Sequence, residues 1–254
     1  MRTAIVIPAR YASVRLPAKP LLRSTGKYLV QHVYERACLA RHFDTVVVAT
    51  DDSRVAAAVG SFGGRCVMTR RDHASGTDRV AEVAENLDAD IVVNLQGDEP
   101  ETDPAALDIL PDLLGKDSEA VMATIAAPIT SDEVYRDPNS VKLVRDGRGR
   151  ALYFSRSPIP FVRDGQPDFA AKPVRFLHHI GVYAYRRDFL LQLAKNAPAV
   201  LEQEEKLEQL RVLTLGRPIH VGIVAHASRG VDTLEDYERF VARHRGRPQP
   251  AMAA

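Results

Sequence analysis

Short apolar runs rich in β-branched residues alternate with segments of helical spacing, and this alternation constrains the fold more than any other feature of the chain. Runs of strand length cover residues 3–7, 45–50, 65–69, 90–95 and 120–129. Continuous apolar runs of this kind are typical of strands that are covered on both faces. Between them, residues 28–40 and 78–87 place apolar side chains on one helical face. The alternation predicts an α/β fold with a mostly parallel sheet, helices on both faces and right-handed crossovers.

The rhythm changes near Thr130, and residues 130–200 are predicted to form a smaller α+β insertion. Residues 141–155 alternate around Asp146-Gly147, which predicts a hairpin. Residues 157–173 are rich in proline and long for a connection, so we expect an irregular, mobile loop. Further elements are expected as a strand at 175–186, a helix at 201–213, a strand at 218–225 and a helix from Asp232. We expect residues 1–245 to form one domain and residues 246–254 to be a disordered tail.

Charge and composition exclude several classes of protein. The net charge of +1 over 254 residues gives no electrostatic reason to expect a nucleic acid or membrane partner. No apolar segment approaches the ~18 residues of a membrane span, and no signal-peptide pattern precedes the first strand. Cys38 and Cys66 belong to no C-x-x-C pair, so we expect two buried thiols in a reducing compartment. These features predict a cytoplasmic protein.

The loop after the first apolar run is basic. Arg10, Arg15 and Lys19 follow one another closely, and no acidic residue occurs before Glu35. The glycine patterns of the Walker and dinucleotide-binding loops are both absent at this position. Side chains would therefore have to hold an anion here, on a loop stiffened by prolines. A solvated basic loop is the alternative, but a position after the first strand of an α/β sheet favours a polyphosphate.

Two aspartates are candidates for a metal site. Asp98 follows a buried strand through a Gln-Gly step, which suits either a Mg²⁺ ligand or a turn residue. Asp232 and Glu235 fit a D-x-x-E helix cap, and this spacing by itself favours the cap over a metal ligand. The carboxylates alone leave both readings open.

Other polar clusters are equally ambiguous by themselves. The segment 69–79 brings several polar residues and a glycine before a helix, where a base or sugar could approach the backbone, or where Ser75 or Thr77 could cap the helix. His179 suits a hydrogen-bonded strand histidine, and Glu208 and Gln209 suit a solvated helix face. No zinc-hydrolase spacing and no G-x-S-x-G elbow occurs in the chain.

Taken together and in order, these motifs resemble the 3-deoxy-manno-octulosonate cytidylyltransferase family. The segments that carry the resemblance are IPARYASVRLPAKPL, VVVATDD, TRRDHASGTDR, VNLQGDEP, ALYFSRSPIP, HHIGVYAYR, LEQEEKLEQLRVL and GVDTLED. The resemblance as a whole covers residues 4–242. The resemblance implies a Rossmann-like nucleotide-diphospho-sugar transferase fold and a homodimer in which residues 130–200 serve dimerisation. It also implies an enzyme that uses Mg²⁺ to transfer CMP from CTP to the anomeric hydroxyl of Kdo for lipopolysaccharide biosynthesis.

The same resemblance implies roles for individual residues. The catalytic set would be Lys19, Asp98 and Asp232, and the two aspartates would hold Mg²⁺. The CTP phosphates would face Arg10, Arg15 and Lys19. The cytidine and sugar would be surrounded by Ser75, Gly76, Arg79 and Gln96. The Kdo pocket would be shaped by Arg71, Arg156, His179, Tyr183, Glu208 and Gln209.

The chain departs from the family pattern at Ala18, Tyr28 and His178, where the family usually has Gly, Pro and Arg. Two alternatives therefore stand beside the Kdo enzyme. One is a cytidylyltransferase for a related acid sugar, such as 8-amino-Kdo or a sialic acid. The other is a nucleotide-binding regulator without turnover. A dehydrogenase is disfavoured because its glycine fingerprint is absent.

Overall fold

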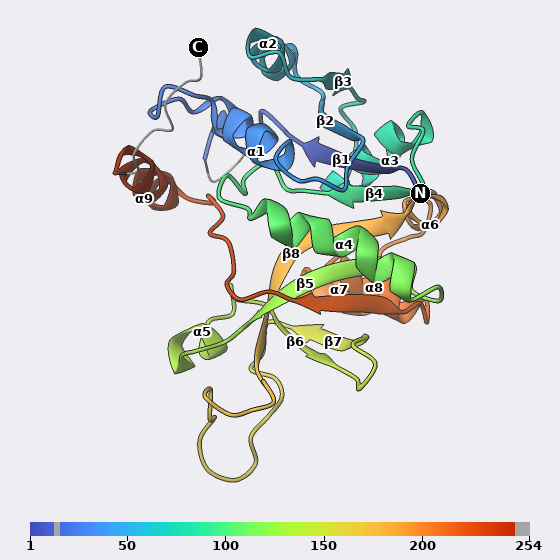
Figure 1. Cartoon of the computed structure of the whole chain (residues 1–254), viewed down its shortest axis with the longest axis vertical. Coiled ribbons are helices and arrows are strands. Elements are labelled where there is room, and N and C mark those ends of the chain that lie inside the picture. Colours follow the sequence, from blue (N-terminus) through green and yellow to red (C-terminus); the bar gives the residue numbers. More distant parts are fainter. Residues whose placement is uncertain (13–15, 247–254) are drawn as a thin grey trace.

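The computed structural model describes residues 1–12 and 16–246, and its helices lie on both sides of one central sheet (Figure 1). The strands are β1 (Thr3–Pro8), β2 (Thr45–Thr50), β3 (Cys66–Met68), β4 (Ile91–Asn94), β5 (Met122–Pro128), β6 (Lys142–Arg145), β7 (Ala151–Ser155), β8 (Leu177–Arg186) and β9 (Ile219–Ile223). The helices are the 3₁₀ turn η1 (Lys19–Leu21), α1 (Leu29–Ala37), α2 (Ser53–Ser61), α3 (Gly76–Glu85), α4 (Pro104–Lys116), α5 (Asp132–Arg136), α6 (Arg187–Leu193), α7 (Val200–Glu205), α8 (Gln209–Thr214) and α9 (Leu234–Arg245).

The sheet is mixed but mostly parallel. Its main strand order is β3-β2-β1-β4-β8-β5-β9. The strands β1 to β4 pair in parallel, as do β5 and β9, whereas β8 runs antiparallel to both β4 and β5. The carboxyl ends of β1, β2 and β4 therefore lie side by side, and the loops that follow these strands share one edge of the sheet. Such an edge is where ligands bind in open α/β sheets.

The core explains why the strand runs are continuously apolar. In β1, Val6 faces a layer that includes Val80 of α3, while Ile7 faces a layer that includes Val33 of α1 and Leu107 of α4. All five side chains are fully buried. Because successive strand residues point to opposite faces, a strand covered on both sides needs apolar residues at every position. Burying each such large side chain stabilises the fold by about 1.5–3 kcal/mol.

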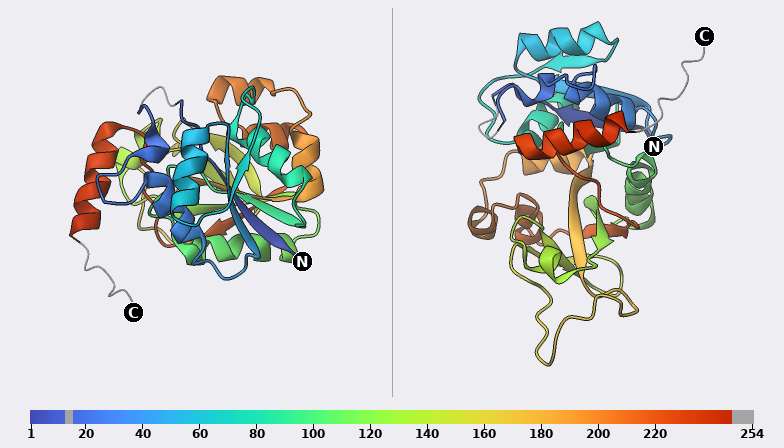
Figure 2. Two further views of the ribbon diagram at one scale, coloured as in Figure 1. Left: turned by 90° about the horizontal axis from the view of Figure 1, so that it is seen from above. Right: turned by 90° about the vertical axis from the view of Figure 1, so that its left-hand side faces the viewer.

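The insertion extends this sheet. The predicted hairpin forms from β6 and β7, and β6 also pairs with β8, so the hairpin joins the sheet through that long strand. The irregular loop 157–173 contains no helix or strand and projects beyond the hairpin, as the right-hand view of Figure 2 shows. The hairpin and the irregular course of the loop were both predicted from the sequence.

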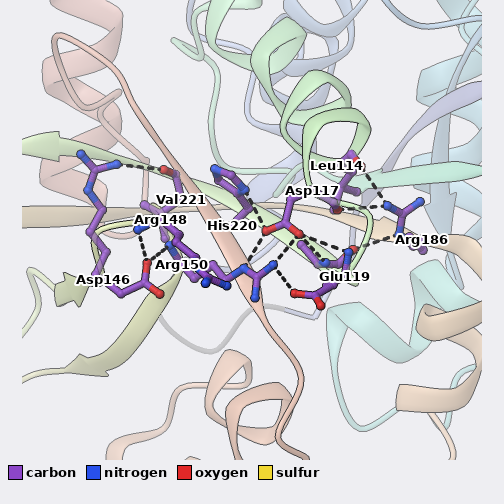
Figure 3. A network of polar contacts seen from close by, with 11 residues as sticks. Leu114, Asp117, Glu119, Asp146, Arg148, Arg150, Arg186, His220 and Val221 are labelled. Atoms are coloured by element: carbon purple, nitrogen blue, oxygen red, sulfur yellow. Dashed lines mark hydrogen bonds and ion pairs between the residues drawn. The ribbon is translucent and has the colours of Figure 1, made fainter.

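A polar network ties the hairpin turn to the end of α4 and to β9 (Figure 3). Arg150 donates through Nε and Nη2 to the two carboxylate oxygens of Asp117, both at 2.8 Å. Nδ1 of His220 lies 3.3 Å from the same carboxylate. The Arg150 hydrogen bonds, followed by backbone donors, lower the pKa of Asp117 to about 2. A carboxyl whose pKa is lower in the folded state stabilises the fold above its unfolded pKa, and that contribution is lost as pH falls.

We expect the Arg150→Met variant to unfold at a temperature lower by about 2–4 °C at pH 7, the scale of one lost charged hydrogen-bond pair in a protein of this size. The variant should also lose less stability than the unmodified chain between about pH 4 and pH 2. Thermal unfolding followed by circular dichroism across this range measures both effects. The control is Arg136→Met, which breaks an exposed pair with Asp132 and should change little. Parallel acid profiles for the Arg150 variant and the unmodified chain would contradict the role assigned to this pair.

Two local predictions were wrong. The single helix expected at 201–213 is two helices, α7 and α8, because Lys206 adopts a left-handed backbone with φ 55°. The break lets Arg211 of α8 turn back onto buried Glu202 of α7, with Nε 2.7 Å from Oε2.

The cysteines are not both buried, since Cys38 is exposed and Cys66 is half-buried, and both thiols are free. Among residues 1–12 and 16–246, no helix is both long and apolar enough to cross a bilayer.

Candidate active site

The three residues predicted to be catalytic meet at the sheet edge. The ammonium of Lys19, on η1, lies 2.6 Å from Oδ2 of Asp98 and 3.2 Å from Oδ1 of Asp232. It also donates to the carbonyl oxygen of Val231 at 2.8 Å. Lys19 is largely buried, with 13% of its side chain exposed, whereas Asp98 and Asp232 are 29% and 49% exposed. Three segments distant in the sequence therefore place one cation between two carboxylates that still reach solvent.

The Asp98 loop is held against two other segments. A Cβ atom at Gly97 would lie 2.7 Å from the carbonyl oxygen of Pro8, so a larger residue would push this loop away from β1. On the other side, the backbone N–H of Val231 donates to the carbonyl oxygen of Asp98 at 2.8 Å. These backbone contacts set the separation of Asp98 and Asp232.

The predicted cap of the last helix is shifted by one residue. Thr233, not Asp232, caps α9: its hydroxyl accepts from the N–H of Asp236, whose carboxylate accepts from the N–H of Thr233 in return. This capping box satisfies the helix terminus without the side chain of Asp232. The carboxylate of Asp232 is instead directed to Lys19.

The donor set fits a magnesium ion. The aspartates supply hard oxygen ligands within reach of a common point, which the Lys19 ammonium now contacts. Within the described residues, no three or more His, Cys, Asp or Glu side chains gather as a complete metal site. A pair of carboxylates is what Mg²⁺ needs when substrate phosphates and water complete its octahedron.

A third carboxyl group lies behind this pair. Burial, together with the neighbouring charges of Asp98 and Asp232, raises the pKa of Glu99 to about 7, against a hydrogen bond from Ser228 and the charge of Lys19. The Ser228 hydroxyl donates to Oε2 of Glu99 at 2.8 Å. A carboxyl group with this pKa is only partly ionised near pH 7, and a divalent cation bound at Asp98 and Asp232 would favour its ionised form.

The nucleotide-binding residues expected on β1 and α3 also converge. Arg79 is fully buried, with Nη2 3.3 Å from Oδ1 of Asp51 and Nη1 directed to the Thr69 hydroxyl. Burial lowers the pKa of Arg79, and neighbouring Arg10 lowers it further. Nη2 of Arg10 and Nε of Arg79 are buried, and neither has a hydrogen-bond partner in the part of the chain that the structure describes. Unsatisfied guanidinium donors of this kind fit an anionic ligand. Arg15 lies outside the described residues.

Ser75, Gly76 and Gln96 lie together at the start of α3. The Ser75 hydroxyl caps the helix by accepting from the N–H of Asp78 at 3.2 Å, as one of the two sequence readings expected. A Cβ atom at Gly76 would lie 3.8 Å from Oε1 of Gln96, an ordinary contact distance, so this amide lies directly beside the first residue of α3.

Four of the six predicted sugar-pocket residues form one group. The rings of His179 and Tyr183 lie 5.4 Å apart, and the Tyr183 hydroxyl donates to Oε1 of Gln209 at 3.2 Å. Nε2 of Gln209 is buried without a partner among the residues described, which leaves a donor for a ligand. Glu208 precedes Gln209 and accepts a hydrogen bond from the hydroxyl of Thr77 at 2.6 Å.

The other two sugar-pocket residues are not joined to that group. Arg71 is exposed on the segment before α3. Arg156 donates to the carbonyl oxygens of Glu205 and Pro138, at 2.7 and 2.9 Å, and so braces the turn that leads to α8. Neighbouring strand residues point to opposite faces, so His178, where the family usually has Arg, does not share the face of His179.

The departure at Ala18 has a visible cost. Ala18 precedes η1 with φ 54° and ψ 25°, a left-handed backbone in which Cβ is crowded and glycine is favoured. The departure at Tyr28 is different, since its φ of −64° is the value that proline imposes.

We expect Ala18→Gly to stabilise the fold by about 0.5–1 kcal/mol, because relief of the strained backbone exceeds the added entropy of the unfolded chain. Urea unfolding of both proteins measures the difference. Ala12→Gly, at an exposed position of the same loop, is the control and should not be stabilising. A less stable Ala18→Gly variant would show that the left-handed conformation is not strained.

Sequence reasoning missed the roles of three buried polar residues near the site. Asn94 and Thr77 connect Gln96 to Glu208 through hydrogen bonds. Lys142 is fully buried and donates to the carbonyl oxygens of Asp137 and Arg156, at 2.8 and 2.6 Å. Asn94 was visible as the one amide in an apolar run and Thr77 only as a possible helix cap, whereas nothing in the local pattern distinguished Lys142.

Comparison with known proteins places this geometry. A sequence profile described as cytidylyltransferase matches residues 4–219. The chain is 50% identical over 248 residues to the 3-deoxy-manno-octulosonate cytidylyltransferase of Geotalea uraniireducens, covering 96% of this chain and 99% of the relative. It is 51% identical over 244 residues to the enzyme of the same name from Syntrophobacter fumaroxidans, covering 95% and 96%.

Solved structures agree with the sequence comparisons. A CMP:2-keto-3-deoxy-manno-octonic acid synthetase complexed with CTP superposes with a TM-score of 0.89 at 46% identity, covering 96% of this chain and 98% of the other. A 4-diphosphocytidyl-2C-methyl-D-erythritol synthase from Anaerococcus prevotii, 12% identical with a TM-score of 0.62, covers 97% of this chain and 96% of its own and shares the fold alone. The predicted α/β fold of the nucleotide-diphospho-sugar transferase type is confirmed.

Proposed function

Because this chain belongs to the cytidylyltransferase family, among the 3-deoxy-manno-octulosonate cytidylyltransferases, we propose that it transfers CMP from CTP to the anomeric hydroxyl of Kdo. In that reaction the sugar oxygen forms a bond to the α-phosphorus of CTP, and the bond from that phosphorus to the bridging oxygen breaks. The products are CMP-Kdo and pyrophosphate.

The observation that carries the proposal is the placement of the Lys19 ammonium between the carboxylates of Asp98 and Asp232. In phosphoryl and nucleotidyl transfer the protein mainly positions the reactants and neutralises charge. Lys19 is a mobile point charge that can follow the phosphates of CTP. Asp98 and Asp232 would hold Mg²⁺, which when bound would neutralise phosphate charge and orient the reacting oxygens.

The remaining nucleotide contacts are assigned to the residues at the ends of β1 and β4 and the start of α3. Arg10 has an unsatisfied buried donor and would grip phosphate oxygens, and Arg15 would join it. Gly76 would admit the nucleoside close to the backbone beside Ser75. Arg79, which is fully buried, would support the Ser75–Gly76 segment from the interior of the fold.

The sugar would lie over β8 and the start of α8. The unsatisfied Nε2 of Gln209 would donate to a sugar oxygen. Burial, with a smaller effect of nearby His178, lowers the pKa of His179 to about 3, so the ring is neutral at working pH. A neutral imidazole cannot balance the sugar carboxylate, and exposed Arg71 is the better candidate for that role.

The test is pyrophosphate release with CTP and Mg²⁺ across Kdo, 8-amino-Kdo and a sialic acid. We expect turnover with Kdo that depends on the added metal and disappears when EDTA removes it. Turnover with only one of the other two acid sugars would identify that sugar as the substrate. Absence of turnover with all three sugars, together with tight CTP binding, would favour a regulator instead.

We also propose that the protein is a homodimer formed through residues 130–200. Three large apolar side chains in this stretch are exposed, Phe161 by 83%, Val200 by 73% and Leu152 by 60%. Exposed apolar groups of this size support an interaction surface in this stretch. Multi-angle light scattering measures the mass directly, and a mass near 28.0 kDa at micromolar concentration would exclude the dimer.

A further inference from the structure

A chain of hydrogen bonds runs from α8 to the loop after β4, through residues that the proposed site does not otherwise use. The Thr77 hydroxyl donates to Oε2 of Glu208 at 2.6 Å. Nδ2 of Asn94 donates to that hydroxyl at 3.4 Å, and Nε2 of Gln96 donates to Oδ1 of Asn94 at 3.1 Å. Asn94 is fully buried and Thr77 is 7% exposed, so these middle links are shielded from water.

The Glu208 carboxylate, at one end of this series of hydrogen bonds, determines which group donates in each of them. An ionised carboxylate only accepts hydrogen bonds, so the Thr77 hydroxyl must donate to Glu208. The hydroxyl then has only lone pairs left for Asn94, which must turn its NH₂ group toward Thr77 and its oxygen toward Gln96. Gln96 must in turn direct its NH₂ group to Asn94. A reversed amide at either position would place two like groups together in a buried site.

We propose that Thr77 and Asn94 are positioning residues, which fix the Gln96 amide so that its Oε1 faces the bound ligand. The ligand group that meets this oxygen is a hydrogen-bond donor, either a hydroxyl or an amino group. The free Oε1 faces the start of α3, since it is the atom near which a Gly76 Cβ would lie, at 3.8 Å. The inference rests on the proposed function, because the family resemblance places Gln96 among the residues that surround the cytidine and sugar. The inference adds which partner donates the hydrogen bond at Gln96, and it names Thr77 and Asn94 as the residues that determine this.

Glu208 is the last acceptor in this series of hydrogen bonds, and several neighbouring groups affect its pKa. Burial raises the pKa of Glu208, and the Thr77 hydrogen bond opposes this increase. The groups that face it are Asp78 on α3, Glu202 on α7, Arg211 on α8, and Tyr183 and Tyr185 on β8. Removing the Thr77 hydroxyl should therefore move the titration of Glu208 to higher pH.

The experiment compares Thr77→Val, which keeps the side-chain shape without the hydroxyl, with Thr77→Ser, which keeps the hydroxyl. We expect Thr77→Val to raise the KM for the substrate that meets Gln96, CTP or Kdo, by about ten-fold, with a smaller change in kcat, because a misoriented amide weakens binding. Its kcat/KM should also fall off at a higher pH on the acid side. Thr77→Ser should restore both. Thr214→Val, which removes a hydroxyl that donates to the Leu210 carbonyl on α8, is the matched control and should behave as the unmodified enzyme.

A second measurement separates this inference from the proposed function. Carbon-13 NMR of labelled glutamate follows the titration of Glu208 in the unmodified protein and in Thr77→Val, whether or not either turns over. An unchanged midpoint would overturn the hydrogen-bond chain. A shifted midpoint with unchanged KM would overturn its positioning role. An unmodified protein without turnover would instead refute the proposed function, and with it the ligand contact at Gln96.

Discussion

Replacing Asp98 with asparagine should lower kcat by about a thousand-fold, since the loss of a metal ligand removes several kcal/mol of charge stabilisation. Asparagine keeps the size of the side chain, and the backbone contacts that hold this loop run through Gly97 and the Asp98 carbonyl oxygen, so the fold should persist. Pyrophosphate release gives kcat, and thermal unfolding reports on the fold.

The matched control for this variant is Glu235→Gln. Glu235 follows Asp232 closely in the chain but is 71% exposed and pairs with Arg239 on α9. The Glu235→Gln variant should leave kcat unchanged, because the negative charge that it removes contacts neither Lys19 nor the site. Unaltered turnover in Asp98→Asn would rule out the metal role, and an equal loss in both variants would indicate a general electrostatic effect.

Replacing Lys19 with methionine should separate metal binding from turnover. The Lys19 ammonium now lies at the point between Asp98 and Asp232 where a cation would bind. Without it, the carboxylates should repel each other and bind Mg²⁺ more tightly in the absence of CTP. Turnover should nevertheless fall by about a hundred-fold or more, because a phosphate-facing cation is missing when charge develops.

Isothermal titration with Mg²⁺ and steady-state kinetics measure these opposite effects in the same preparation. Lys27→Met serves as the control, since Lys27 pairs with Glu35 and is 46% exposed. Weaker Mg²⁺ binding in Lys19→Met would mean that the ammonium supports the metal site. Normal turnover would mean that it does not face the phosphates.

The layered fold could be predicted because each strand carries its own signal. β1, β2, β4 and β5 are continuously apolar where a sheet is covered on both faces, and Val6 and Ile7 confirm this by facing opposite layers. Helix breaks were harder to predict. A helical period runs through 201–213 without interruption, yet Lys206 turns left-handed so that Arg211 can reach Glu202, a contact that no local pattern encodes.

The candidate site was predictable to a similar degree. The resemblance to the family predicted Lys19, Asp98 and Asp232 as the catalytic set, and the structure brings them within hydrogen-bond distance. The local spacing alone favoured Asp232 as a helix cap. Only the neighbouring Thr233–Asp236 capping box shows that the helix terminus is satisfied otherwise.

By itself, the sequence determined the strand and helix alternation, the basic loop without glycines and the residue types of the site. These depend on side-chain periodicity and on motifs a few residues long. The tertiary structure decided which charges meet. Lys19 and Asp232 are separated by more than two hundred residues, and the strand order β2-β1-β4 together with the Val231–Asp98 backbone contact brings them together. The partners of buried polar groups such as Asn94 and Thr77 were decided in the same way, because a hydrogen bond in the core is set by the packing of distant elements.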